Sequence, residues 1–261
     1  MREPRGRIRC VLTSLALCAA IGLAPVRAAA AGLKITPLAA GLTYENLSRT
    51  VVWKGDADSA KILANLISAR ADLGFGKGIV VSLSAGLALT DFKRLSFASL
   101  PVSLQYDAPP LAGFSLGVEA LAPLLKFSDF EISGTGRFVC SFGMSKTWPI
   151  EGFVVEGKAA GSTSWAEAAL GPRLSYLFFG RVVPYVEVCA RWLAAGFEMT
   201  ETLGDLVGNE TKRVRGDFSF SAALGADVAV SDRIAVKARV GIVPFAGGTD
   251  SLLSVGILYK F

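Results

Sequence analysis

Apolar residues alternate with polar or small residues along most of the chain, and this period of two constrains the fold more than any other feature. In residues 79–90 every odd position is apolar, whereas the even positions are mostly Ser, Gly, Ala or Thr. The same alternation recurs in residues 114–122, 218–228, 234–242 and 253–261. Neighbouring side chains of a β-strand point to opposite faces, so each segment is predicted to be a strand with one apolar face.

Ten segments of this kind are expected, and together they predict an all-β fold. They span residues 33–46, 60–75, 79–91, 97–106, 112–127, 163–179, 182–199, 214–230, 233–245 and 250–261. Short connectors with turn-forming residues are found at 76–78, 107–110, 180–181 and 231–232, and most of the others are longer. This alternation is typical of an antiparallel up-and-down β-barrel with its short turns at one end. Residues 128–162 have room for another hairpin, so twelve strands stay open, as do eight.

The composition separates two kinds of barrel from other folds. Hydrophobic residues make up 52% of the chain, charged residues only 19%, and the mean hydropathy is +0.48. After residue 28, the longest stretch without a charged residue is Gly78–Thr90. A membrane-spanning helix needs about 20 apolar residues, so the apolar character does not come from such helices. The chain is therefore either a transmembrane β-barrel or a soluble barrel with an apolar interior.

The faces of the predicted strands favour the transmembrane β-barrel. The polar face is rich in Ser, Gly and Ala and carries charges of both signs, which suits a crowded lumen better than a solvated exterior. Aromatic residues on the apolar face are expected to form two interfacial bands. The band beside the short turns contains Phe75, Tyr106, Phe114, Phe178, Tyr259 and Phe261, and the other contains Tyr44, Trp165, Trp192 and Phe218. A soluble lipid-binding barrel is the alternative.

The first 28 residues are expected to be a secretory signal peptide. Four arginines precede residue 10, residues 10–26 are uncharged, and small residues follow at 28–31. This order is typical of a signal peptide, with cleavage between residues 28 and 31. Residues 29–261 are then the outer-membrane β-barrel.

Ten charged residues share the polar face of the predicted strands and are expected to line the lumen. They are Arg70, Asp72, Glu119, Glu167, Arg173, Glu187, Arg191, Asp227, Lys237 and Arg239. A charge that faces lipid near the midplane costs a few kcal/mol, whereas charges inside a narrow lumen can pair. Since five are acidic and five are basic, we expect a salt-bridged plug. An ion-conducting or substrate-lining pore is the alternative.

Catalysis and cofactor binding are not expected. Residues 113–117 match the G-x-S-x-G motif of hydrolases, but they lie inside a predicted strand, and the chain contains no His to act as a base. Without His, and with only Cys140 and Cys189 after the leader, no metal or haem site is predicted. The five Arg and one Glu of residues 1–28 leave 22 basic and 21 acidic residues, a balance that gives no support for nucleic-acid binding. Whether Cys140 and Cys189 form a disulfide stays open.

The last predicted strand carries a resemblance to a known family. Residues 254–261 read SVGILYKF, alternate apolar residues with others, and end in Phe. This segment resembles the terminal signal of small bacterial outer-membrane β-barrels of the OmpA, OmpX, OmpW and opacity type. The resemblance implies that Tyr259 and Phe261 belong to a signal read by the barrel-assembly machinery. That family usually has eight strands, and the predicted ten depart from it.

These observations predict a non-enzymatic, monomeric protein of the bacterial outer membrane, with membrane lipid as its surroundings. A structural or surface-interaction role is expected to depend on extracellular loops, chiefly residues 128–162 and 200–213. A narrow channel for small or hydrophobic solutes is one alternative function, and a soluble lipid-binding barrel is a second. The sequence identifies neither a surface ligand nor a transported solute.

Overall fold

The computed structural model describes residues 36–52, 59–97, 104–150, 157–245 and 248–261. The chain divides into residues 1–36 and a unit of residues 37–261, and the description below concerns the second unit. The predicted signal peptide of residues 1–28 and its cleavage between residues 28 and 31 lie outside the described residues. Among those that are described, no helix is long and apolar enough to cross a membrane.

The described part of the chain is almost entirely antiparallel β-strand. One short 3-10 turn, η2 (Gly76–Gly78), connects the second strand to the third. The strands are β1 (Thr36–Val52), β2 (Ser59–Phe75), β3 (Ile79–Phe97), β4 (Leu104–Phe127), β5 (Phe130–Gly143), β6 (Lys146–Ile150), β7 (Gly157–Tyr176), β8 (Val182–Leu203), β9 (Leu206–Ala229), β10 (Ile234–Phe245) and β11 (Gly248–Lys260).

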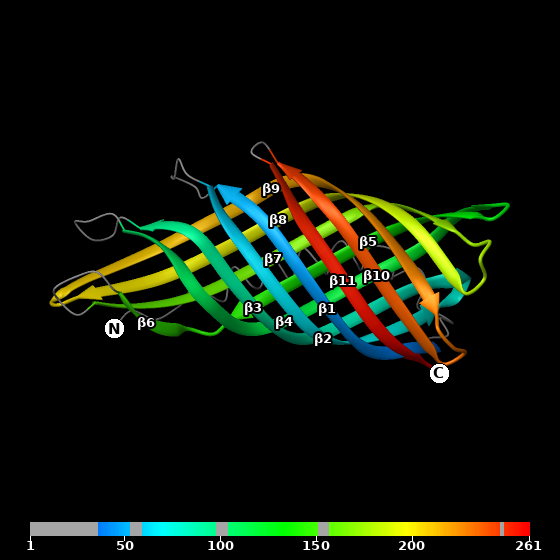
Figure 1. The fold of residues 1–261 in the computed structure, drawn as a ribbon, viewed down its shortest axis with the longest axis horizontal. Helices are drawn as coiled ribbons and strands as arrows, with labels where there is room; N and C mark the ends of the chain where they lie inside the picture. The colour runs from blue at the N-terminus through cyan, green and yellow to red at the C-terminus, as the bar shows by residue number, and fades with distance from the viewer. Residues whose placement is uncertain (1–35, 53–58, 98–103, 151–156, 246–247) are drawn as a thin grey trace. The chain divides into compact units, whose positions relative to one another are not determined.

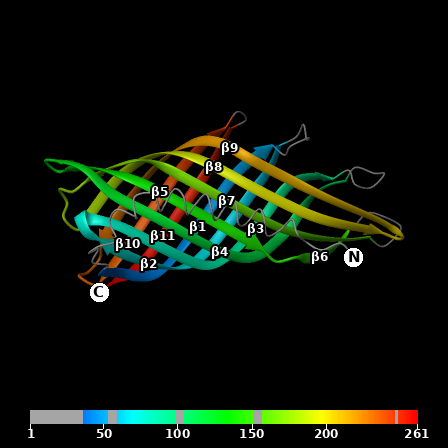
Figure 2. The same cartoon turned by 180° about the vertical axis from the view of Figure 1, so that it is seen from behind.

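The strands form a closed ring. Consecutive strands pair from β1 to β5, β5 pairs with β7, and pairing continues in order to β11, which returns to β1. β6 continues the line of β5 along β7, since Phe142 pairs with Ser164 and Lys146 pairs with Gly161. β5 and β6 thus occupy one position, and the described strands fill ten positions, which agrees with the predicted count. Figure 1 shows β10, β11, β1 and β2 crossing one wall obliquely, and Figure 2 shows the wall behind it.

The ring has two ends that differ in their connections. At one end, here called the turn end, short connections join β2 to β3, β4 to β5, β7 to β8 and β9 to β10. At the other end, here called the loop end, the remaining connections lie, of which only the two-residue turn between β8 and β9 is fully described. The predicted turns at 76–78, 180–181 and 231–232 lie at the turn end, as an up-and-down barrel requires.

The predicted turn at residues 107–110 is wrong, because this segment lies inside β4. Thr90 of β3 pairs with Leu111, but Phe92 pairs with Ala108, so two residues of β4 lie opposite one residue of β3 and form a bulge. Proline cannot donate to the strand ladder, and a bulge is one of the few places in a sheet that tolerates it. The predicted strands 97–106 and 112–127 are therefore one strand, and residues 92–96 belong to β3 rather than to a connector.

The two long loops expected at residues 128–162 and 200–213 are also wrong in part. The first contains β5, β6 and the start of β7, and its residues 128 and 129 form a tight turn at the turn end. In the second, the strands continue on both sides of Gly204 and Asp205. On β5 the alternation was hidden because Gly134 and Gly136 occupy outward positions where apolar side chains were expected.

Aromatic side chains on the outer face form two bands. At the turn end, five rings contact one another in a group: Phe127, Phe130, Tyr176, Phe178 and Phe179. Tyr259 and Phe261 form a further pair at the same end. Nearer the loop end, exposed aromatic residues are Tyr44, Phe114, Phe142, Trp192 and Phe218. On β5, Phe130 and Phe142 are separated by about 40 Å of strand, or about 30 Å of height at the usual strand tilt. The bands are therefore spaced like the interfaces of an outer membrane.

Two aromatic residues differ from their predicted places, and a third is not tested. Phe114 belongs to the band nearer the loop end, because the turn expected beside it does not exist. Trp165 points into the barrel and is only 3% exposed, since it shares the parity of Glu167 on β7. The side chain of Tyr106 lies outside the described residues.

The closure between β1 and β11 provides a test of the ring. The pairing runs from Ala39 opposite Lys260 to Leu47 opposite Leu252, and a Cβ atom at Gly41 would collide with the backbone of Ile257. We expect Gly41→Ala to destabilise the protein by about 1–3 kcal/mol, because backbone cannot give way as a side chain can. The measurement is the thermal midpoint of the far-ultraviolet circular dichroism signal.

The matched control for this variant is Gly134→Ala, on β5. A Cβ atom there would make an ordinary contact, 3.7 Å from Cδ1 of Leu124. Its effect is expected to stay within about 0.5 kcal/mol. Equal midpoints for the two variants would contradict a tight closure at Gly41.

Candidate functional site

Along several strands the face that carries the apolar side chains changes from the outer to the inner one. On β8, nearer the turn end, Val186 and Val188 face outward while Glu187 and Arg191 face inward. Beyond Trp192 the order changes: Phe197 and other apolar side chains face inward, and the outward positions are small or polar. β2 and β3 reverse in the same way. The lumen therefore contains a charged layer toward the turn end and an apolar layer toward the loop end.

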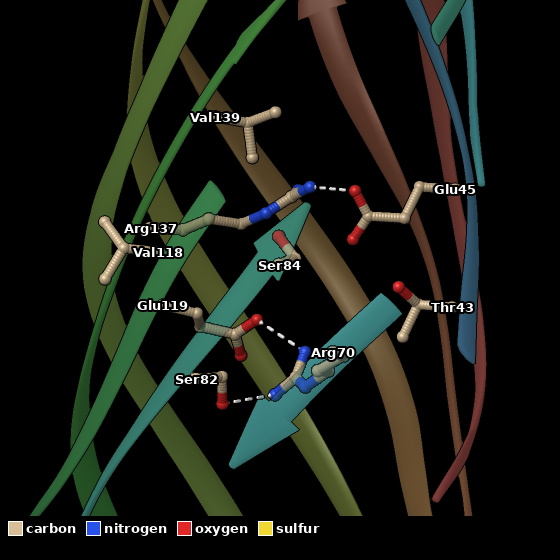
Figure 3. Close-up of a pocket in the computed structure, with 9 residues that line it drawn as sticks. All are labelled: Thr43, Glu45, Arg70, Ser82, Ser84, Val118, Glu119, Arg137 and Val139. Atoms are coloured by element: carbon tan, nitrogen blue, oxygen red, sulfur yellow. Dashed lines mark hydrogen bonds and ion pairs between the residues drawn. The ribbon is translucent and has the colours of Figure 1, made fainter. Parts of the chain in front are cut away.

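Arg70 is the centre of one ion-pair group in the charged layer. Its Nε lies 2.7 Å from Oδ1 of Asp72 on the same strand, and its Nη1 lies 3.1 Å from Oε2 of Glu119 on β4. A third nitrogen donates to Oγ of Ser82 at 2.7 Å, as Figure 3 shows. Lys237 on β10 approaches the other oxygen of Asp72 at 2.9 Å. These contacts connect walls of the barrel that do not pair with each other.

Glu167 on β7 holds a second group and is 5% exposed. Its two oxygens pair with two different arginines: Oε2 with Nη1 of Arg49 at 3.1 Å, and Oε1 with Arg191. Arg191 also donates from Nε to Oγ of Ser221 at 2.9 Å. Both arginines are almost completely buried, so Glu167 balances two charges that have no access to water.

The remaining predicted lumen residues form two further pairs. Arg173 on β7 pairs with Asp227 on β9 at 2.7 Å, and its guanidinium carbon lies 3.4 Å from the ring centroid of Tyr185. Glu187 on β8 pairs with Arg239 on β10 at 3.3 Å. The structure thus places all ten predicted lumen residues on the inner face, each in at least one ion pair.

Several inward charges were missed by the sequence analysis. Arg137 of β5 pairs with Glu45 of β1 across the lumen (Figure 3), and Arg49 pairs with Glu167. Arg137 was missed because it lies in the segment expected to be a loop. Glu45 and Arg49 lie at or beyond the expected end of the first strand. The signal was present, since Thr43, Glu45, Leu47 and Arg49 share one parity.

The apolar layer was not predicted. Phe92 of β3 and Phe197 of β8 meet at a centroid distance of 5.0 Å, and neither ring is exposed. Trp165 packs in the same cluster and donates from Nε1 to Oγ1 of Thr90 at 3.1 Å. Ile62 and Met199 belong to the same cluster. Side chains of this size occupy the interior in the way that a soluble protein core is filled.

Two small cavities lie in the described part of the lumen. One cavity, lined by Arg70, Glu119, Arg137 and neighbouring side chains, has a volume of about 10 Å³. A second, lined by Glu45, Trp165 and Glu167 among others, has the same volume. A buried water molecule needs about this much room, so each cavity has space for one water and not for a hydrated ion.

The other residues singled out in the sequence are Ser115 and the two cysteines. Ser115 of the G-x-S-x-G segment lies within β4, faces the lumen, and its Oγ lies 3.4 Å from Oγ of Ser68. Cys140 and Cys189 are both free thiols. On their strands Cys140 has outward parity, whereas Cys189 is buried on the inner face. The wall of the barrel separates the two sulfur atoms, so they do not form a disulfide.

Tyr259 and Phe261, the expected assembly signal, lie at the turn end. Both side chains are exposed on the outer face, and their rings contact each other edge to face at 5.7 Å. Tyr259 pairs with Ala40 of β1 and with Ile234 of β10, so it belongs to the strand that closes the ring.

Comparisons with known proteins agree with this geometry at the level of the fold. No protein-family model and no curated protein matches the chain. The structure is similar to the outer membrane protease OmpT of Escherichia coli, with 12% identity and a TM-score of 0.51, over 88% of this chain and 96% of that one. It is also similar to the translocator domain of the autotransporter NalP of Neisseria meningitidis, with 15% identity and a TM-score of 0.46, over 95% and 98%. The chain therefore has the fold of a bacterial outer-membrane β-barrel, as its sequence predicts.

Proposed function

We propose that this chain is an integral outer-membrane β-barrel that conducts no solute, performs no catalysis and acts as a monomer through the surface at its loop end. The observation that carries the proposal is the filled lumen, with a charged layer and an apolar layer in series. A barrel filled in this way can bind ligands on its outer surface but has no room for them in the lumen.

The outer face between the aromatic bands supports membrane insertion. Leu170 is 70% exposed and Leu224 60%, and many other large apolar side chains of this face are similarly uncovered. A soluble monomer rarely exposes so much contiguous apolar surface. The soluble lipid-binding barrel also requires an interior cavity for its ligand, and the two lumen cavities described above are far too small to hold a lipid.

The loop end supports the surface role. β7, β8 and β9 continue well beyond Trp192, and their outward residues there are polar, among them Lys158, Thr200 and Thr211. The pairing of β9 with β10 runs from residue 222 to residue 229, so the stretch from Leu206 to Val214 extends beyond the described ladder between these two strands. We infer that this stretch and the polar face beside it, rather than long loops, are the interaction surface.

The membrane assignment is tested by introducing a lysine on the outer face, once inside the apolar belt and once beyond its edge. Leu170→Lys places a charge within the apolar belt, and we expect it to cost about 2–4 kcal/mol of folding free energy in lipid. Thr211→Lys, outward on β9 beyond the boundary, is the matched control and is expected to change little. The fraction of folded protein is read from the mobility of unboiled against boiled samples on a gel.

In a soluble barrel Leu170→Lys would leave stability unchanged or improve solubility. That outcome, or a wild-type protein that is a compact monomer in buffer without detergent, would overturn the membrane assignment.

The charged layer is tested at Glu167. Glu167→Gln removes the carboxylate that pairs with both Arg49 and Arg191, and we expect the free energy of unfolding to fall by about 3–5 kcal/mol, the usual cost of breaking a buried ion pair. Asp205→Asn, in the exposed turn between β8 and β9, is the control and is expected to change it by less than about 0.5 kcal/mol. Denaturant titration in detergent micelles gives the free energy of unfolding of both variants. An unchanged value for Glu167→Gln would show that the ion pairs of Glu167 do not stabilise the structure.

The absence of conduction is tested directly in planar lipid bilayers. Protein that shows the folded band on an unboiled gel is expected to give no regular single-channel steps, because neither cavity of the lumen has room for a hydrated ion. Regular steps whose ion selectivity changes on neutralising Glu187 or Arg191 would instead support the narrow channel.

A further inference from the structure

We infer that the register between β1 and β11 is set by two carboxylates, those of Glu45 and Asp250, which keep β1 from sliding along β11 by two residues. The inference concerns the closed ring itself and holds whether the ring lies in lipid or in water. It assigns a positioning role to two acidic residues outside the ten charges that the sequence placed in the lumen.

The pairing of β1 with β11, here called the seam, differs from the other pairings in the ring. Where a short turn joins two strands, the turn fixes which residues lie opposite each other. The seam cannot be fixed in this way, because all the other strands lie between β1 and β11 in the sequence. Its register therefore has to come from contacts between the strands themselves.

Alternation excludes only some of the wrong registers. A slip by one residue would turn the inner face of β1 to the outside, whereas a slip by two keeps every side chain on its own face. The outer face of β11 presents Val255, Ile257 and Tyr259 in turn. Leu42 of β1, which lies opposite Ile257, would have an apolar or aromatic neighbour in all three registers. The outer face thus does not distinguish the native register from a slip by two.

Glu45 marks the native register in the middle of the seam. It lies opposite Ser254 of β11, whose Oγ donates to Oε1 of Glu45 at 3.4 Å. Its Oε2 accepts from Nη2 of Arg137, which reaches across the lumen from β5 (Figure 3). A slip by two would move this carboxylate about 7 Å along β11 and away from the arginine. It would then lie opposite Gly256 or Leu252, and neither has a side chain that can donate a hydrogen bond.

Asp250 marks the same register nearer the loop end. Beyond the last pair of the described ladder, its Oδ2 accepts from the backbone N–H of Thr50 at 2.5 Å. Its Oδ1 accepts from the hydroxyls of Thr50 at 3.0 Å and Ser48 at 3.3 Å, and Nζ of Lys61 lies 3.9 Å away. Asp250 is only 2% exposed, so these donors replace the water that a buried carboxylate lacks. A slip by two would separate the carboxylate from all three donors of β1.

Gly41 opposes the same slip nearer the turn end. A Cβ atom at this position would collide with the backbone of Ile257. A slip by two would bring Ala39 or Thr43 opposite Leu258 in place of Gly41, and with it a Cβ atom for which β11 has no room. The two carboxylates thus favour the native register, and the close approach at Gly41 disfavours the slipped ones.

The test reads the register from disulfides between cysteines on the outer face of the seam. The full chain carries serine at its four native cysteine positions, and Leu42→Cys is combined with Ile257→Cys, Val255→Cys or Tyr259→Cys. Cα atoms of directly opposite residues lie within the range of about 4.4–6.8 Å that a disulfide spans, whereas diagonal neighbours, at about 7–8 Å, do not. The Ile257 pair reports the native register, and the other two pairs report a slip in either direction.

Protein that shows the folded band on an unboiled gel is oxidised with diamide, and the cross-linked fraction of each pair is measured by mass spectrometry. The readout is the ratio of the native to the slipped fraction. We expect Glu45→Gln to lower this ratio about tenfold, the usual effect of losing one hydrogen bond to a charged group, and Asp250→Ala in the same chain to lower it a further tenfold. The exchange Glu45→Arg/Arg137→Glu keeps one charge of each sign at these positions and should restore the ratio.

Asp227→Asn is the matched control, because it breaks a lumen ion pair, that with Arg173, in which β1 takes no part. It should keep the wild-type ratio while lowering stability. An unchanged ratio in Glu45→Gln, an equal loss in Asp227→Asn, or an exchange variant no better than Glu45→Gln would each overturn the inference. If Glu45→Gln gives no folded band, the exchange variant remains the test, since it is expected to restore both the band and the ratio.

Discussion

Closure of the backbone ladder is the constraint on which the rest of this structure depends. In lipid, an unpaired strand edge leaves N–H and C=O groups without partners at a cost of several kcal/mol each, so a spanning sheet has to return to its first strand. Here β11 returns to β1 over nine residue pairs. Once the ring is closed, successive side chains must alternate between membrane and lumen. Every outward position in the belt is then selected for apolar character, and the inward positions are free to carry charge.

The lumen is filled by two kinds of packing because the barrel passes through two environments. Between the aromatic bands the exterior is apolar, and the interior contains ion pairs such as Arg70–Glu119 and Arg191–Glu167. Beyond Trp192 the exterior is polar, and the interior contains Phe92, Phe197 and Trp165. Where the outer face has to be apolar to contact lipid, the inner face carries charged residues, and these form ion pairs. Where the outer face is in water, the apolar residues can instead be buried inside the barrel. The second layer adds a core that a membrane span alone would not have.

The two layers also explain why the proposed function is assigned to the outer surface of the barrel. In the proposed function the exterior is the interaction surface, and it changes character with height. The belt between the aromatic bands is apolar, and the strands β7 to β9 present a mostly polar face beyond it. Each of these surfaces is formed by the outward-facing residues of the same alternating strands.

The sequence by itself determined the barrel, its ten positions and the ten charges on its inner face, because a period of two is a local property of each strand. It could not locate the bulge at residues 107–110 or the strand β5, since Pro109 and Gly134 read as turn signals until a neighbouring strand is present to pair with them. Trp165 was placed outside, and the apolar layer was missed, for a further reason. Whether an alternating segment turns its apolar side outward or inward depends on the medium around it, and only the tertiary structure decided where along each strand that medium changes.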